Sequence, residues 1–526
     1  MVANLGNSDN LPKVDVTIND FGLRIAPPDL GPKVTIIGGF NHAGGTVPLN
    51  EPLQIQNMGV AMRNLRNDDG TPSELTLAIE EVLGGGASNI EVVVSATGRN
   101  TPYEGTIDSS YVNALHSELE TTYDNLLNHD VDVVYLASAY ADGFATVDGF
   151  DTGTAKHTGL VDHASGSNFA KQLADFCYQQ TKESNSAFGV IGVTPISKVA
   201  KQLMWQENSA TSVTSFSGSE GAYFDVPSLA LVKEYVNYLT QETGDTGIFN
   251  GTSSSDTGTY PDVQAALYAK WNTYLYGSVQ GSDVTLPHST YISEFQAKDI
   301  DGSLATDTDG NKVDAGAYIS VIGGVSRAFG SEATKFAALK GASTLTYVNS
   351  NGAAGFAGLL ANTAPYIGTT NTAVNSISQL RSISAKQAKD LLRHRIVSMI
   401  NKPAGYVVTS GITGAFNAGS RSRSDFIRIT TTRTTQAMAE VVRDAGEAFI
   451  GKPISGPFLA ALESAIDTNL QKAVRRGAIR AFDFALSSSP DQQVLGEVSI
   501  DLSMIPAFEL VTINTTVSLS KGEGLG

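Results

Sequence analysis

The residues of this chain whose types could do chemistry are a run of aspartates, seven histidines, one cysteine and a glycine triplet. The aspartates have the composition of a calcium loop: Asp299, Asp301, Asp307 and Asp309. Gly310 follows Asp309 directly, so the spacing departs from that of an EF-hand. The segment DTDGN at 307–311 is instead typical of a hairpin turn. We predict a turn and no metal site.

The other candidates also have simpler structural interpretations. The triplet at 84–86 closes a helical pattern and precedes a strand pattern, whereas a phosphate loop follows a strand and opens a helix, so we predict a helix C-cap. Cys177 lies between aromatic residues on a predicted helix, which favours a core position. The histidines have no metal-ligand spacing, and the common hydrolase, nucleotide and CxxC motifs are absent. We predict no cofactor, no metal and no enzymatic activity.

A basic cluster ends a predicted helix from Pro457 to Arg476. Its members are Lys472, Arg475 and Arg476, and their i, i+3, i+4 spacing places them on one patch. They lie away from an apolar stripe formed by Phe458, Leu462, Ile466, Leu470 and Val474. Two interpretations remain open. The cations could stabilise the helix dipole by about 0.3–1 kcal/mol, or they could bind an acidic partner.

The elements that must position these residues begin with an α/β region. Between about 33 and 200, short apolar runs alternate with helical patterns, which predicts a mostly parallel or mixed sheet. The runs are VTIIGGF, IEVVVSATG, VDVVYLA and FGVIGVTP, and AYISVIGGV at 317–325 returns to the same pattern. Residues 207–315 are rich in Ser, Thr, Gly and Asp, which predicts a loop-rich insertion.

Size and charge limit the class of protein. A chain of 526 residues with 41% apolar and 17% charged residues is globular and needs two to four domains. The net charge of −18 argues against nucleic-acid binding, yet residues 393–480 hold thirteen Lys and Arg against six Asp and Glu. The first residues lack a secretory signal and no apolar run is long enough to span a bilayer. The single cysteine fits a reducing compartment.

Both ends of the chain carry alternating apolar residues, as strands with one buried face do. At the N-terminus these are Val14, Val16 and Ile18, in a strand predicted at about 13–19. At the C-terminus they are Val511, Ile513, Val517 and Leu519, in a strand predicted at about 508–520. Such strands either close their own sheet or add to the sheet of a neighbouring molecule. The pattern alone favours neither.

The last hundred residues follow a definite order. The alternating segment DFIRITTTRTT at 425–435 predicts a strand, and the helices TQAMAEVVRDAGEAFIGKP and SGPFLAALESAIDTNLQKAVRRGAI follow it. The strands IRAFDFAL, GEVSIDLSMIP and FELVTINTTVSLS end the chain. Residues 425–519 resemble the C-terminal domain of contractile tail sheath proteins in this order of elements. Arg433 in ITTTRTTQAMAEVV and the glycine-containing turn in LQKAVRRGAIRAFDF are part of the resemblance. The middle departs from the family, because VSRAFGSEATKFAALKG stands where an Arg…Pro-Ala segment is often found.

The resemblance implies an α/β and α+β multidomain fold. It divides the chain into an extended arm at 1–27, a peripheral α/β region at 28–385 and a sheath core domain at 386–526, with helices packed on a mixed sheet. It also implies stacked hexameric rings of this chain around an inner tail tube, with baseplate and tail terminator proteins as further partners. Contraction would drive the tube through an envelope. The expected location is a virion tail assembled in the host cytoplasm, with no direct nucleic-acid contact and no membrane insertion.

Two hypotheses follow for named residues. The helix at 457–476 would face the tube through Lys472, Arg475 and Arg476, and the terminal strands would join neighbouring subunits. Two alternatives remain for the whole chain. One is a sheath from a non-viral injection or secretion system. The other, from a different class, is an α/β enzyme with a Ser/Gly-rich lid, which a pocket with converging titratable groups would favour.

Overall fold

A computed structural model describes most of the chain outside its ends and its long insertion. The described residues are 32–40, 47–55, 58–68, 70–97, 109–127, 129–141, 169–183, 186–192, 295–307, 310–323, 326–339, 347–379, 388, 391–392, 395–415, 425–495 and 497–511. The arm predicted at 1–27 lies outside them, as does the predicted insertion except for 295–307 and 310–315.

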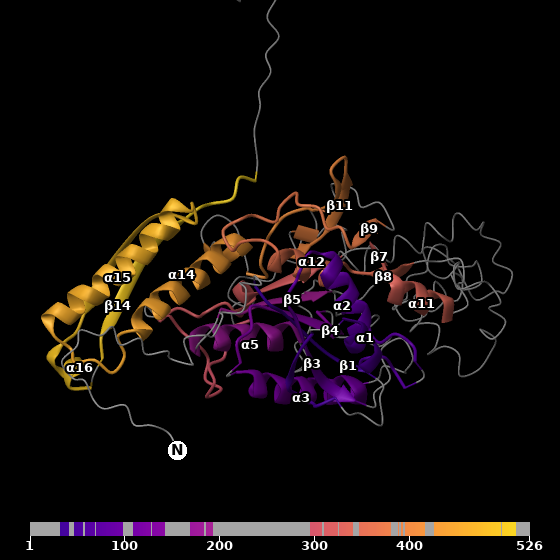
Figure 1. The fold of residues 1–526 in the computed structure, drawn as a ribbon, viewed down its shortest axis with the longest axis horizontal. Helices are drawn as coiled ribbons and strands as arrows, with labels where there is room; N and C mark the ends of the chain where they lie inside the picture. The colour runs from indigo at the N-terminus through magenta and orange to yellow at the C-terminus, as the bar shows by residue number, and fades with distance from the viewer. Residues whose placement is uncertain are drawn as a thin grey trace, which may run out of the picture.

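A seven-stranded sheet organises the larger part of the molecule (Figure 1). Its order is β10–β6–β5–β4–β1–β3–β2, and only β2 runs antiparallel to its neighbour. The strands are β1 (Val34–Phe40), β2 (Pro52–Gln54), β3 (Ile90–Thr97), β4 (Val133–Tyr140), β5 (Phe188–Gly192), β6 (Ile319–Ile322) and β10 (Ile396–Val397). These strand directions confirm the prediction of a mixed, mostly parallel sheet. The apolar residues of β1, β3, β4, β5 and β6 are buried, as expected for strands covered on both faces.

Helices cover both faces of this sheet (Figure 1). On one face lie α2 (Glu74–Gly84) and α12 (Ala353–Ala361), and on the other lie α3 (Ser109–Leu126) and α5 (Phe169–Glu183). Tyr123 of α3 stacks on Phe176 of α5 with ring centroids 4.6 Å apart. Cys177 is fully buried beside them, and burial raises the pKa of its thiol, so the predicted core position is confirmed.

Smaller elements lie at the edges of the sheet. They are α1 (Met58–Asn64), α11 (Ser331–Leu339), the sheet β8 (Tyr347–Ser350)–β7 (Ser326–Phe329)–β9 (Ile377–Gln379), the hairpin β11 (Met399–Lys402)–β12 (Gly405–Val408), and a 3₁₀ turn at Ala315–Tyr318 before β6. Residues 308 and 309 of the hairpin turn predicted at 307–311 lie outside the described residues. On either side of them the Gly310 amide donates to the Asp307 carbonyl and the Asp307 amide donates to the Asn311 carbonyl, as the predicted turn requires. Within the described residues, no cluster of His, Cys, Asp or Glu could hold a metal ion.

Adjacent carboxylates on α2 fix two other helices. Glu80 accepts hydrogen bonds from the backbone amides of Ser331 and Glu332 at the start of α11, at 2.5 and 3.0 Å. Glu81 accepts from the Gly355 amide in the first turn of α12 at 3.0 Å and from the Ser350 hydroxyl at 2.9 Å. Negative charge is favourable at a helix N-terminus, which suits the Glu80 carboxylate at the start of α11. Glu81 holds α12 through the hydrogen bonds that it accepts, so α2 fixes both helices through two neighbouring side chains.

We expect Glu81 to make stability depend on pH. Complete burial raises the pKa of its carboxyl from 4.5 to about 7, against the opposing effect of the hydrogen bonds from Gly355 and Ser350. A raised folded-state pKa favours the protonated form in the fold, so this contribution is full below pH 4.5 and is lost as pH rises through 7. In urea unfolding, the stability of wild type relative to Glu81→Gln should fall by about 2–3 kcal/mol between pH 5 and pH 8.

The matched control for this experiment is Glu120→Gln, at an exposed position of α3. Comparing each variant with wild type at the same pH removes the titration of all other groups. A difference between wild type and Glu81→Gln that stays constant with pH would contradict the prediction. Such a result would mean that the Glu81 carboxyl titrates in the fold as it does in the unfolded chain.

A second structural unit begins at residue 425. It contains a 3₁₀ turn at Asp425–Ile427, α14 (Ile429–Glu447), α15 (Gly456–Arg475), β13 (Ile479–Ser487), α16 (Pro490–Leu495) and β14 (Ser499–Pro506). We call these residues, 425–506, the C-terminal unit. It projects from one side of the sheet (Figure 1). β10 at 396–397 pairs with β6, so the seven-stranded sheet takes a strand from beyond residue 386. The domain boundary expected at 386 stays a prediction.

The strand predicted at 425–435 is wrong, because these residues form the 3₁₀ turn and the first turns of α14. The threonines in ITTTRTT have high β propensity, but Thr430, Thr431, Thr432 and Thr434 are all buried in the helix. The hydroxyl of Thr432 donates to the Phe426 carbonyl, which ties the helix to the preceding turn. Tertiary burial therefore overrides the local preference of β-branched residues. Among the described residues, no helix is long and apolar enough to cross a membrane.

Candidate functional site: the α14–α15 face and the β13–β14 ribbon

The basic helix predicted from Pro457 to Arg476 is α15, whose bounds differ by one residue at each end. Ser455 precedes it, Pro457 lies in its first turn, and Gly477 follows it with φ +77°, a left-handed conformation that favours glycine. Leu462, Ile466 and Leu470 of the predicted stripe are buried against α14 and the ribbon, whereas Phe458 and Val474 are partly buried. The apolar stripe predicted for this helix is therefore the side that packs on the core of the unit.

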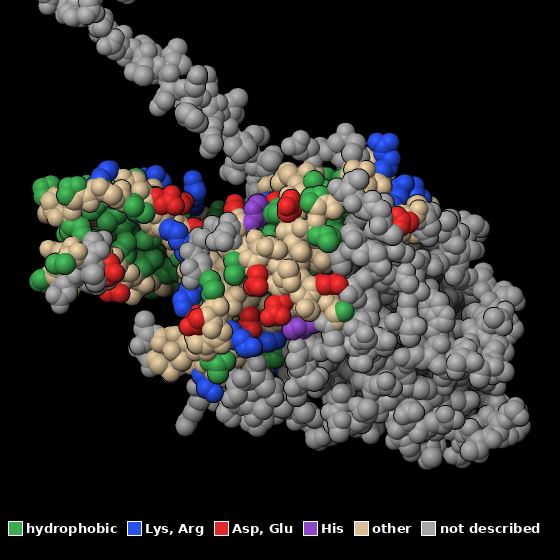
Figure 2. All heavy atoms as spheres, turned by 90° about the horizontal axis from the view of Figure 1, so that it is seen from below, with side chains coloured by type: hydrophobic (Ala, Val, Ile, Leu, Met, Phe, Trp, Pro, Cys, Tyr) green, Lys and Arg blue, Asp and Glu red, His purple; other side chains and the backbone are tan. Residues whose placement is uncertain are grey.

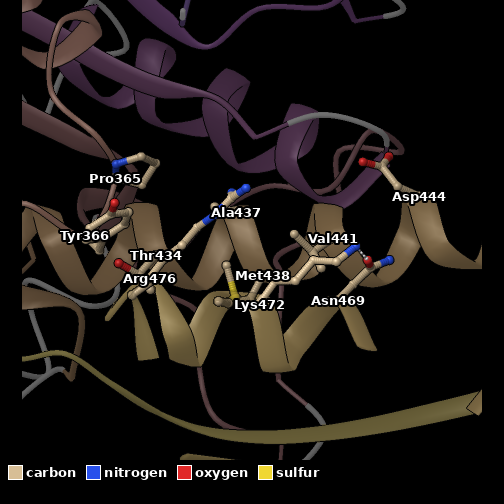
Figure 3. A pocket seen from close by; sticks show the side chains of 12 residues that line it. Pro365, Tyr366, Thr434, Ala437, Met438, Val441, Asp444, Asn469, Lys472 and Arg476 are labelled. Atoms are coloured by element: carbon tan, nitrogen blue, oxygen red, sulfur yellow. Dashed lines mark hydrogen bonds between the residues drawn. The ribbon is translucent and has the colours of Figure 1, made fainter. Parts of the chain in front are cut away.

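The structure brings the three basic residues together on the last turn of this helix, where Lys472, Arg475 and Arg476 are all exposed. Lys472 Nζ donates to Asn469 Oδ1 at 3.0 Å, so its ammonium group is held along the helix (Figure 3). The three cations lie at the negative end of the helix dipole, which accounts for part of their placement. Their exposure leaves them free to meet an acidic surface as well.

A hollow of about 410 Å³ lies between α14 and α15, beside the loop at 365–366. Apolar side chains dominate its lining, with Thr434, Asp444, Asn469, Lys472 and Arg476 as its polar members (Figure 3). The apolar members are Pro365, Tyr366, Ala437, Met438, Val441, Ala473 and Ala478. Two of the three predicted basic residues therefore border an apolar recess. The sequence analysis missed this recess, although the alanines at 437, 473 and 478 are the small residues that leave room for it.

α14 is fixed to the α/β region by polar contacts along one face. Arg433 is buried and its Nη1 donates to the Thr363 carbonyl at 3.2 Å. Burial lowers the pKa of its guanidinium to about 10, and the charge of Asp132 opposes that change, so Arg433 stays protonated at neutral pH. Gln436 Nε2 donates to the Ala187 carbonyl at 2.8 Å. Arg433, which marks the sequence resemblance, is thus a structural residue at the junction.

One more contact completes this junction. Glu440 accepts from the Ser186 amide at 2.7 Å, immediately before β5. Burial raises the pKa of the Asp132 carboxyl to about 6, and the charges of Asp130 and Glu440 add to this rise. The junction therefore depends on hydrogen bonds and on charges held away from water, and it fixes the direction in which the C-terminal unit projects.

β13 and β14 form a two-stranded antiparallel ribbon, with pairs from Ser487 with Ser499 to Ile479 with Pro506. One face carries alternating apolar side chains that are only partly buried against the helices: Phe482, Phe484, Leu486, Ile500, Leu502 and Met504. Within the described residues no third strand pairs with this ribbon. Figure 2 shows hydrophobic side chains gathered on the lobe that this unit forms, at the left of the view.

Most of the residues predicted to pair between subunits lie outside the described part of the chain. Val511 is described and exposed, and residues 507–511 are not part of a strand. The strand predicted at about 508–520 stays a prediction, since a single chain does not test pairing between subunits. Ile513, Val517 and Leu519 lie outside the described residues, as do Val14, Val16 and Ile18. Their role in strand pairing stays a prediction.

No family model matches this chain, and no curated protein matches it in sequence. Solved structures do match it along nearly its whole length. The sheath complex of an extracellular contractile injection system, PVC, in its contracted state has a TM-score of 0.48 at 9% identity, covering 93% of this chain and 92% of that one. The contracted helical sheath of the anti-feeding prophage has a TM-score of 0.46 at 10% identity, with 99% and 100% covered. The sheath tail protein of Listeria innocua has a TM-score of 0.41 at 10% identity, with 91% and 92% covered.

Proposed function

We propose that this chain is the structural subunit of a contractile sheath, polymerising as stacked hexameric rings around an inner tube. The observation that carries the proposal is the β13–β14 ribbon, whose apolar face is only partly covered and which has no third strand among the described residues. A two-stranded ribbon is at best marginally stable by itself, and its open edges are templates for strands of other molecules. Strands from neighbouring copies would complete this sheet.

The terminal segments are the proposed source of those strands. Val14, Val16 and Ile18 at one end, and Ile513 and Val517 at the other, alternate as a strand with one buried face requires. Pairing along a whole segment supplies main-chain hydrogen bonds without a dedicated pocket. In this proposal each copy would give its terminal strands to its neighbours, and the rings would stay linked while the subunits move.

The exposed end of α15 is the proposed contact with the inner tube. Lys472, Arg475 and Arg476 form a basic patch on a chain whose net charge is −18, so an acidic tube surface would complement them. Exposed ion pairs of this type contribute about 0–1 kcal/mol each. Such contacts are weak enough to break when the sheath contracts, and numerous enough around a tube to hold it before contraction.

We further propose that the sheath belongs to a phage tail, with baseplate and tail terminator proteins at its ends and no catalytic role for the subunit. Gene neighbours test the viral part: capsid and terminase genes beside this one would support a virion, and their absence from the locus would favour a non-viral injection system. In either case the mechanical role of the subunit is the same.

Negative-stain microscopy of the purified full chain tests the central proposal. We expect long striated tubes or contracted cylinders with sixfold end views. A protein that stays monomeric at high concentration, with and without its tube protein, would refute a sheath function.

A further inference from the structure

The segment that follows β14 is held at two points. The Ala507 amide donates to the Ala478 carbonyl at 3.1 Å, next to the end of α15. Two residues later, Glu509 Oε1 accepts from the Thr370 amide at 3.2 Å. The chain therefore crosses from the C-terminal unit to the α/β region over residues 507–511 in a fixed position. We call these residues the exit segment.

The seat of Glu509 is built for this side chain. Gly368 leaves the room, because a Cβ atom at that position would lie 2.5 Å from Glu509 Cδ. The loop is itself fixed, since Thr370 Oγ1 accepts from the Gly411 amide at 2.9 Å and the Asn371 amide donates to the Val408 carbonyl at 2.8 Å. The α/β region thus holds the exit segment through a rigid loop and one carboxylate.

Anchoring Glu509 turns its two neighbours toward solvent. Phe508 is 61% exposed and Leu510 is 75% exposed, whereas Glu509 between them is partly buried. Ile505, at the end of β14, is also exposed. Single exposed apolar residues need no explanation, but adjacent ones on a fixed segment indicate a contact surface. We call Ile505, Phe508 and Leu510 the exit strip.

We infer that the exit strip is a contact surface between copies of this chain, and that Glu509 is the residue that positions it. The inference rests on the proposed sheath function and names one of its interfaces. The strip continues directly from β14, so a second copy whose strand pairs with the ribbon would reach Phe508 and Leu510 next. It carries no basic residue, which distinguishes it from the patch at Lys472 that we assign to an acidic tube.

The strip itself is tested with Phe508→Ser/Leu510→Ser in the full chain. We expect wild-type circular dichroism and thermal unfolding, with a critical concentration for tube assembly raised at least about tenfold, because two large apolar side chains lose their buried contact. The matched control is Ile300→Ser/Leu304→Ser, a pair exposed to 52% and 57% on the α/β region, which should assemble as wild type does. Equal critical concentrations for the two double variants would overturn the inference.

The positioning role is tested separately at the seat. Glu509→Ala removes the carboxylate that accepts from the Thr370 amide. Gly368→Ala places a methyl group where the Glu509 side chain lies, without backbone strain. Each variant keeps Phe508 and Leu510 and should raise the critical concentration about three- to tenfold. Glu509→Gln keeps an oxygen that can accept from Thr370 and should assemble within about twofold of wild type. Normal assembly of both alanine variants would show that Glu509 does not position the strip. Failure of wild type to assemble would refute the sheath function instead.

Discussion

Removing residues 1–20 should leave a folded monomer that no longer forms tubes. The described structure begins at residue 32, and β1 at 34–40 lies in the interior of the seven-stranded sheet, so the deletion takes nothing from the described core. If Val14, Val16 and Ile18 pair with the ribbon of a neighbour, each subunit loses a strand of hydrogen bonds to the next. We expect the critical concentration to rise at least about a hundredfold, measured by sedimentation and negative-stain microscopy.

Point variants test whether assembly depends on the apolar face of the arm or only on the presence of the arm. Changing Val14, Val16 and Ile18 to Asp should abolish assembly as the deletion does, since alternate residues lie on one face of a strand. The matched control is Asp15→Ser/Thr17→Ser, on the opposite face, which should assemble normally. Global unfolding of the deletion variant would show that the strand belongs to its own core, and normal tubes from it would show that no inter-subunit pairing depends on this arm.

The strands of the large sheet could be predicted from the sequence because burial on both faces produces continuous apolar runs. Their order could not, because runs such as FGVIG and ISVI are interchangeable as partners and carry no information about neighbours. β10 contributes only Ile396 and Val397, too short a run to recognise. The membership of this strand in the large sheet could therefore not be foreseen from the sequence.

The site was predictable to the extent that it depends on one helix. The spacing of Lys472, Arg475 and Arg476 predicts that they share one face of the helix, because side-chain positions on a helix depend only on local geometry. The hollow beside them needs α14, α15 and the loop at 365–366, and the seat of Glu509 needs Gly368 and Thr370, far away in the chain. Contacts between distant segments leave no periodicity in a sequence, so a single chain does not reveal them before it folds.

Reversing Lys472, Arg475 and Arg476 to Glu should leave the subunit folded and able to polymerise, while releasing it from the tube. All three side chains are exposed. Among the described residues the contact of Lys472 with Asn469 is their one side-chain hydrogen bond, so the fold should lose little. Each reversal turns an attraction to an acidic surface into a repulsion, and the effect repeats in every subunit along the tube. We expect empty sheaths and naked tubes by microscopy, with tube-bound sheath reduced by at least about tenfold.

The matched control reverses three other exposed basic residues, Arg63, Lys298 and Lys312, which lie in the α/β region. Both triple variants change the net charge by the same amount, so a general effect of charge on solubility or polymerisation would appear in both. Tube-filled sheaths from the α15 variant would exclude this patch from tube binding and leave the helix dipole as the reason for its charges. Loss of tubes only in the α15 variant would support the contact. Recovery of tube binding when the acidic residues of the tube are exchanged for Lys would assign it to these three side chains. The recovery is measured at low salt, because at about 0.1 M salt charges are screened over a distance of about 10 Å.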